Sequence, residues 1–211
     1  MNGLTEEYLL SYTAAPLLPR VMQQLAQLYT ESADWKTVEQ RAVQENIFQK
    51  PTVASQKRVY SELLKRFNHL TSEQIKYIAT APMDDVRVIA LLGALKAYRL
   101  IREFIAEVVY EKFYLFDYII QNSDYVSFIS SKEAHSSKLA TISESTHKKL
   151  RQVMFNMLHE GGLLHDTKSL MIQKPLLSDQ VIQLIVADDP RLLGLFLMSK
   201  DEINHYIGNR E

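Results

Sequence analysis

From Ser143 to Leu177 the chain reads SESTHKKLRQVMFNMLHEGGLLHDTKSLMIQKPLL, and this segment predicts a long helix that leads into a short β-hairpin. Its first half repeats apolar residues at i, i+3, i+4, i+7 and i+8, which is the spacing of one buried face of an α-helix. These residues are Leu150, Val153, Met154, Met157 and Leu158. Ser143 or Ser145 can cap the start, because a serine hydroxyl accepts hydrogen bonds from free N–H groups of the first turn.

The end of the helix and the hairpin are predicted from the residues that follow. Gly161-Gly162 can end the helix, since glycine adopts the left-handed conformation at low cost. Two apolar runs come next, Leu163-Leu164 and Leu170 to Ile172, with polar residues between them and Pro175 after the second. A helix that leads into a short hairpin is the core of a winged helix-turn-helix.

The polar side of this helix and the hairpin carry candidate DNA-binding side chains. Lysine and glutamine are residue types that reach phosphates and base edges in a major groove. The candidates are Ser145, Lys148, Lys149, Arg151 and Gln152 on the helix, with Lys168 and Lys174 on or beside the hairpin. The alternative interpretation is a core helix with an ordinary solvated face, followed by a structural hairpin.

A second basic line lies on a helix predicted from Ser55 to about His69. It consists of Lys57, Arg58, Lys65 and Arg66. These side chains are a further candidate DNA contact. The alternative is again a solvated face, partly neutralised by Glu62.

Helical spacing runs through nearly the whole chain, so we predict an all-α protein with one small hairpin. Residues 1–121 are expected to form an N-terminal helical bundle around a helix at 86–95, which is apolar around most of its circumference. Residues 122–211 show the order helix, short helix, long helix, hairpin. We therefore expect them to form a winged-helix-like region with C-terminal packing helices.

Composition limits the possible functions. The chain has 211 residues, 46% of them hydrophobic, which suffices for one compact domain or two small ones. Its formal net charge is −1, so any DNA-binding surface must be a local patch. The chain has no cysteine, which excludes disulfides and thiolate metal sites. The longest apolar run, Val88 to Leu95, is far shorter than the about 20 residues of a membrane span. We expect a cytoplasmic protein that does not enter the membrane.

Catalytic motifs are missing from the sequence. The six histidines form no H-E-x-x-H zinc pattern, and neither a phosphate-binding glycine loop nor a G-x-S-x-G elbow occurs. The carboxylate pairs Asp84-Asp85 and Asp188-Asp189 stand at helix starts or in loops, where they favour the helix dipole. The aromatic residues between Phe104 and Tyr118 could stack on bases, but helical spacing is more typical of core. We expect no catalysis, metal or cofactor.

Several short segments, spread over nearly the whole chain, have the order and spacing found in one protein family. They are Tyr8 to Tyr12, Asp34-Trp35, Glu45 to Lys50, Ser55 to Arg58, Arg102 to Phe104, Glu111 to Phe113, Lys148 to Val153 and Gly162 to Leu164. Together they resemble BrxA, the small component of BREX phage-defence systems. In that family an alanine more often precedes the glycine before the hairpin, whereas this chain has Gly161.

The resemblance implies a small helical protein similar to the antitermination factor NusB. It also implies a DNA-binding component that works beside a methyltransferase and ATPases of the same system. The expected function is non-catalytic binding of double-stranded DNA, largely through phosphate contacts. Two alternatives remain open: a protein–protein adaptor, which the near-neutral charge favours, and an RNA-binding helical protein. The family's older description as an inner-membrane protein disagrees with the short apolar runs.

Overall fold

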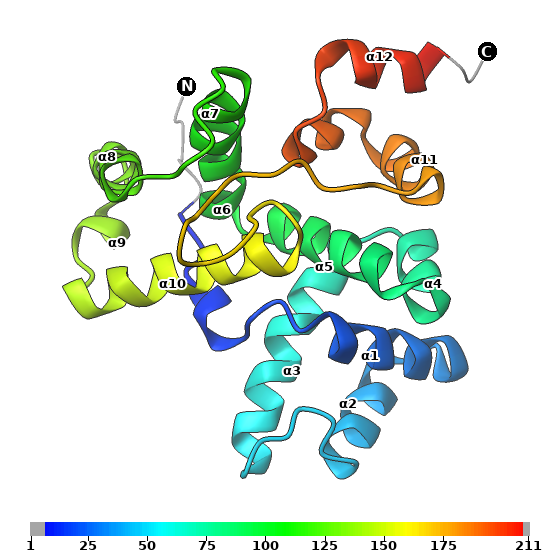
Figure 1. The fold of residues 1–211 in the computed structure, drawn as a ribbon. Coiled ribbons are helices and arrows are strands. Elements are labelled where there is room, and N and C mark those ends of the chain that lie inside the picture. Colours follow the sequence, from blue (N-terminus) through cyan, green and yellow to red (C-terminus); the bar gives the residue numbers. More distant parts are fainter. Residues whose placement is uncertain (1–6, 209–211) are drawn as a thin grey trace, which may run out of the picture.

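The computed structural model describes residues 7–208, which form helices in a compact arrangement (Figure 1). In this part of the chain no segment forms a β-strand, so the predicted predominance of helix is confirmed. The elements are η1 (Ser11–Ala14), α1 (Pro19–Ser32), α2 (Trp35–Gln44), α3 (Val53–Phe67), α4 (Ser72–Thr80), α5 (Met83–Ala97), α6 (Arg99–Phe104), η2 (Ile105–Val109), α7 (Tyr110–Tyr114), α8 (Asn122–Glu133), α9 (Ser137–Ala140), α10 (Glu144–Glu160), α11 (Asp179–Asp188), η3 (Pro190–Phe196) and α12 (Lys200–Gly208).

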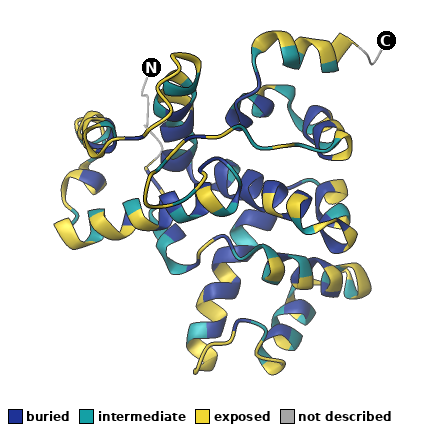
Figure 2. Ribbon diagram, in the orientation of Figure 1, coloured by how far each residue is buried: buried dark blue, intermediate teal, exposed yellow. Residues whose placement is uncertain are grey.

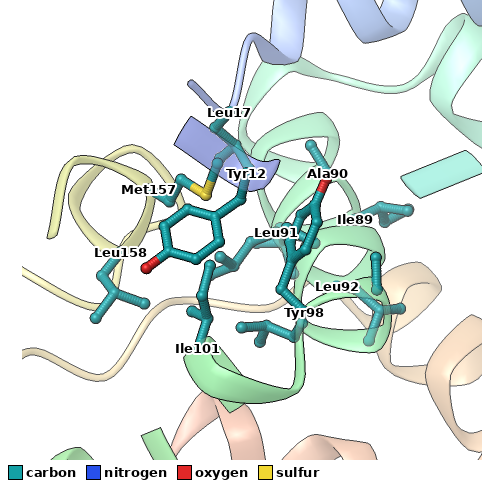
Figure 3. Close-up of a cluster of buried hydrophobic side chains, with 14 of the residues drawn as sticks. Tyr12, Leu17, Ile89, Ala90, Leu91, Leu92, Tyr98, Ile101, Met157 and Leu158 are labelled. Atoms are coloured by element: carbon teal, nitrogen blue, oxygen red, sulfur yellow. The ribbon is translucent and has the colours of Figure 1, made fainter. Parts of the chain in front are cut away.

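Helix α5 lies at the centre of the core. From Val88 to Leu95 all of its residues are buried, and α1, α3, α4, α10 and α11 contact it (Figure 2). Figure 3 shows the buried side chains of α5 packed with Tyr12 of η1, Tyr98 and Leu158 of α10. A helix without a polar face can only be stable when other helices surround it, as the sequence predicted.

Helix α10 forms as predicted, with the predicted stripe buried. The Ser143 hydroxyl accepts a hydrogen bond from the Thr146 N–H at 3.3 Å and caps the helix start. Gly162 takes a φ of +86°, the left-handed conformation in which glycine ends a helix.

The predicted β-hairpin after α10 does not form as strands. Two isolated antiparallel bridges stand in its place, Leu164 with Ile172 and Ile119 with Met171. Leu170 has a φ of +51°, which interrupts the extended backbone that a strand needs. Each β-bridge therefore involves one residue from each segment and does not extend into a ladder. The segment is a loop that backbone hydrogen bonds hold in place.

The predicted boundary between residues 121 and 122 stays a prediction. Helix α5, before the boundary, contacts α10 and α11, which come after it, and one hydrophobic cluster includes residues of both parts.

No helix within residues 7–208 combines the length and the hydrophobicity that crossing a bilayer requires.

Gly161 gives a stability prediction. A Cβ at this position would lie 2.4 Å from Cδ2 and 2.9 Å from Cβ of Leu91, because the end of α10 packs directly on α5. We expect Gly161→Ala to lower the free energy of unfolding by about 1–3 kcal/mol, the usual cost of overpacking a core. Chemical denaturation measures this. Gly194→Ala is the control, since none of the described residues has an atom within 4 Å of a Cβ there. Equal stability of the two variants would contradict the proposed packing role.

Candidate nucleic-acid interface

The exposed face of α10 carries four of the predicted side chains. Ser145, Lys148, Lys149 and Gln152 are all exposed, at positions spaced by three and four residues, on the side opposite the buried stripe. The structure therefore brings these four residues to one accessible surface of one rigid helix. No interaction partner is found for the Lys149 ammonium within residues 7–208, so its charge is available to a ligand.

The Lys148 ammonium is held only weakly. It lies 2.9 Å from Oε1 of Glu144, one helical turn earlier, and the two side chains are 74% and 83% exposed. Exposed ion pairs of this kind contribute about 0–1 kcal/mol, because water and salt screen them. A phosphate group can therefore compete with Glu144 for this lysine.

Arg151 is half-buried and is positioned by α8. Its guanidinium donates a hydrogen bond to Oδ1 of Asn122 and lies 6.0 Å from the centre of the Tyr125 ring. These contacts join α10 to the start of α8. The structure thus places Arg151 beside the exposed face, with part of its hydrogen-bonding capacity already used.

Lys168 is exposed in the loop that follows α10. The loop is fixed by Asp166, whose carboxylate accepts hydrogen bonds from the Ser169 hydroxyl at 2.6 Å and from the N–H groups of Ser169 and Lys168 at 2.8 and 2.7 Å. Together these bonds lower the pKa of Asp166 to about 2, and the bond from the Ser169 hydroxyl contributes most to that shift. The backbone that presents Lys168 is therefore held in one conformation without a strand.

Lys174 is neutralised by a partner within the chain. Its ammonium contacts both carboxylate oxygens of Glu202, at 2.5 and 2.7 Å, and so ties the loop to α12. Of the two lysines predicted on or beside the hairpin, only Lys168 is free of an ion pair in the described part of the chain.

The second basic line, on α3, divides into exposed and buried residues. Arg58 is exposed without an ion pair among the described residues, and the Lys57 ammonium lies 3.7 Å from Oε1 of Glu39. The Lys65 ammonium contacts Oε2 of Glu62 at 2.9 Å and the Ser11 hydroxyl at 3.1 Å. The basic line on α3 is therefore a weaker candidate for a DNA contact than its four positive charges suggested.

Arg66 is a correction to the predicted set. Its side chain is 0% exposed, so it cannot contact a DNA duplex that binds at the protein surface. The guanidinium donates hydrogen bonds to the carbonyl oxygens of Ala15, Pro16 and Leu17, at 2.7, 2.7 and 3.2 Å. Arginine has five donors in a fixed fork, which suits it to bind successive carbonyls of an irregular segment. Helical spacing gave no signal of this, because the carbonyls come from about 50 residues earlier.

The two basic helices meet at η1. The Tyr12 hydroxyl donates to the Leu150 carbonyl oxygen of α10 at 3.3 Å, and the Ser11 hydroxyl donates to Oε1 of Glu62 on α3 at 2.9 Å. Figure 1 shows α3 and α10 diverging from this turn.

The structure also adds Lys138 of α9, an exposed lysine in the short helix just before α10. Its place in the sequence, five residues before the capping Ser143, was the available signal.

Comparison with known proteins gives a consistent result. The sequence model of a family described as BrxA matches residues 6–189. A protein named BREX protein BrxA, from Bacillus cereus (strain H3081.97), is 32% identical over 173 residues, which are 82% of this chain and 86% of that protein. The fold is similar to that of an uncharacterized protein from Magnetospirillum magneticum, solved by crystallography, with a TM-score of 0.78 and 17% identity. That match covers 92% of this chain and 99% of the other, and concerns the fold alone.

Proposed function

The chain belongs to the BrxA family of the BREX phage-defence system, and we propose that it binds double-stranded DNA there without catalysing a reaction. Most contacts are to phosphates, from lysines that a rigid helix presents. Binding of this kind takes place where the DNA lies, in the cytoplasm. For non-specific binding of this type we expect a dissociation constant of about 10⁻⁴–10⁻⁶ M at physiological salt.

The observation that carries the proposal is Lys149 on the exposed face of α10, which has no partner among residues 7–208. Ser145 and Gln152 flank it at steps of four and three residues, and both side chains are exposed. An ammonium group beside a hydroxyl and an amide provides a phosphate contact together with groups that can hydrogen-bond to base edges or phosphates. The face lies opposite the buried stripe, so DNA can approach it without any change in the core.

The loop after α10 supports a winged-helix-like use of this surface. Lys168 is exposed in this loop, and we expect it to contact the flanking DNA backbone as a wing lysine does, although the loop has no strands. Lys57 and Arg58 on α3 provide a second cluster of positive charge, on the other side of η1. We include these three residues in the proposed surface and leave out Arg66 and Lys174.

Replacing Lys149 with glutamine tests the site. The variant keeps helix propensity but removes the charge, so we expect weaker binding and a salt dependence of log K that is shallower by about 0.9, one lost phosphate contact. Fluorescence anisotropy with a labelled duplex measures both. Lys76→Gln is the matched control, because Lys76 is an exposed lysine on α4. Figure 1 shows α4 at a distance from most of α10. Equal losses in the two variants would contradict a specific role for Lys149.

A second candidate function, a protein–protein adaptor within the defence complex, is favoured by one exposed apolar segment. Leu115 and Phe116 are 76% and 79% exposed at the end of α7. Contiguous exposed apolar side chains often mark contact sites for other proteins. This function would be favoured by complexes with the methyltransferase or ATPase that survive nuclease and high salt and that Phe116→Ser disrupts.

An RNA duplex that displaces DNA from the protein would favour the RNA-binding alternative.

A further inference from the structure

A cavity of about 490 Å³ lies between η2, η3 and α12, away from the proposed DNA surface. Ala106 and Tyr110 line it on one side, and residues of η3 and α12 on the other. Small-molecule sites typically have volumes of about 300–1,000 Å³ and are lined mainly by apolar side chains. Nine of its eleven lining residues come after residue 189, where the match to the family model ends.

The described part of the chain leaves the walls of this cavity uncovered. No atom of residues 7–208 lies within 4 Å of a Cβ built on Gly194, and Ala106 is exposed although it lies in the middle of a helical segment. On α12, Ile203 and Ile207 are one turn apart and both face the cavity, yet Ile207 stays 43% exposed. The apolar lining of the cavity is therefore not covered by an apolar side chain from the described part of the chain.

The opposite wall is irregular backbone. Ile105–Val109 forms a π-helical turn, a conformation that is rare in proteins and occurs frequently at functional sites. Ala106 and Tyr110 border the cavity from this turn and from the residue after it. The additional residue in such a turn changes the direction of the following side chains, and here it leaves the small Ala106 at the wall.

The charge at the rim is positive. The Lys200 ammonium has no partner within residues 7–208, whereas the Arg191 guanidinium is held by Asp189 at 2.8 Å. Among the described residues no acidic side chain lines the cavity, and Asn204 adds an uncharged polar group. An apolar lining with one free cation at its edge is complementary to a molecule that has an apolar body and one negative group.

We propose that this cavity binds an amphipathic anion, a linear apolar chain that ends in a carboxylate. The chain lies between Gly194, Ala106 and the isoleucines of α12, and the carboxylate contacts Lys200. Each methylene group that enters the cavity is expected to strengthen binding about fourfold, from about 0.8 kcal/mol per buried methylene. The proposal is independent of DNA binding, since none of these residues belongs to the proposed DNA surface.

Titration calorimetry of the full chain with hexanoate, octanoate, decanoate and decanol tests the proposal. We expect affinity to rise with chain length, and decanoate to bind more tightly than decanol. Gly194→Phe and Ala106→Leu fill the cavity from opposite walls and are expected to weaken decanoate binding at least tenfold. Lys200→Gln is expected to weaken decanoate binding by about two- to fivefold, as for an exposed ion pair, and to leave decanol binding unchanged. Lys36→Gln is the control for a lysine elsewhere.

Three outcomes would overturn the proposal. The first is decanoate binding that persists in both filled variants while thermal unfolding shows that they are folded. The second is equal affinity for decanoate and decanol, with no effect of Lys200→Gln. The third is a dimer of the free protein, detected by analytical ultracentrifugation, that Gly194→Phe dissociates, because a second copy would then occupy the cavity.

Discussion

Arg66→Ala is expected to lower the free energy of unfolding by about 3–5 kcal/mol, the range for removing one partner of a buried charged network. The carbonyl oxygens of Ala15, Pro16 and Leu17 would lose their donors. They lie in the segment between η1 and α1, and a buried carbonyl without a partner is costly wherever water cannot reach it. The variant should therefore release the N-terminal segment from the core.

The loss extends to Tyr98 and Glu62. The Arg66 Nε donates to the Tyr98 hydroxyl at 3.3 Å, and that hydroxyl donates to Oε1 of Glu62 at 2.6 Å. Burial acts to raise the pKa of Glu62, but hydrogen bonds from Tyr98, Lys65 and Ser11 outweigh it and lower the pKa. Glu62 is thus a buried carboxylate at neutral pH, and Arg66→Ala removes the guanidinium that donates to its partner Tyr98.

Urea denaturation of Arg66→Ala beside Arg58→Ala measures this effect. Arg58 lies on the same helix but is exposed, so its substitution should change the free energy of unfolding by no more than about 0.5 kcal/mol. If Arg66→Ala is as stable as Arg58→Ala, the buried arginine does not anchor the N-terminal segment, and our assignment of its role is wrong.

The second large effect is expected from reversing three exposed charges. Replacing Lys148, Lys149 and Lys168 together with glutamate should weaken binding to duplex DNA by about 10²–10³-fold or more at 0.1 M salt, because three phosphate contacts are lost. All three side chains are exposed, and none takes part in the core. Electrophoretic mobility shift with a duplex of random sequence measures the loss.

The matched control reverses Lys36, Lys76 and Lys200, three exposed lysines elsewhere on the protein. The net charge of the two triple variants is the same, so a difference between them cannot arise from overall repulsion. Similar losses in both variants would mean that DNA responds only to total charge. The exposed face of α10 would then not be the binding surface.

The sequence was sufficient to predict much of the helical structure, because local signals control it. The stripe from Leu150 to Leu158, the capping Ser143 and the apolar α5 each depend on nearby residues, and the structure confirms them. The strands of the predicted hairpin are not confirmed, and the left-handed backbone at Leu170 could not be read from the sequence, because leucine rarely adopts it.

The candidate site was only partly predictable for a related reason. Exposure on α10 follows from spacing, so Ser145, Lys149 and Gln152 could be assigned from the sequence. The partner of a charged side chain depends on contacts between distant segments. Lys174 pairs with Glu202, 28 residues later, and periodicity carries no information about such a pair.

The central claim, that lysines on α10 and the following loop bind DNA phosphates, is tested most directly by the salt dependence of duplex binding. Anisotropy titrations between 50 and 300 mM salt should give log K lines of different slope for the wild type and for Lys148, Lys149 and Lys168 all replaced by alanine. We predict a slope shallower by about 2.7 in the triple variant, which is 0.9 for each of three lost contacts. Parallel lines with equal affinities would contradict the proposed function.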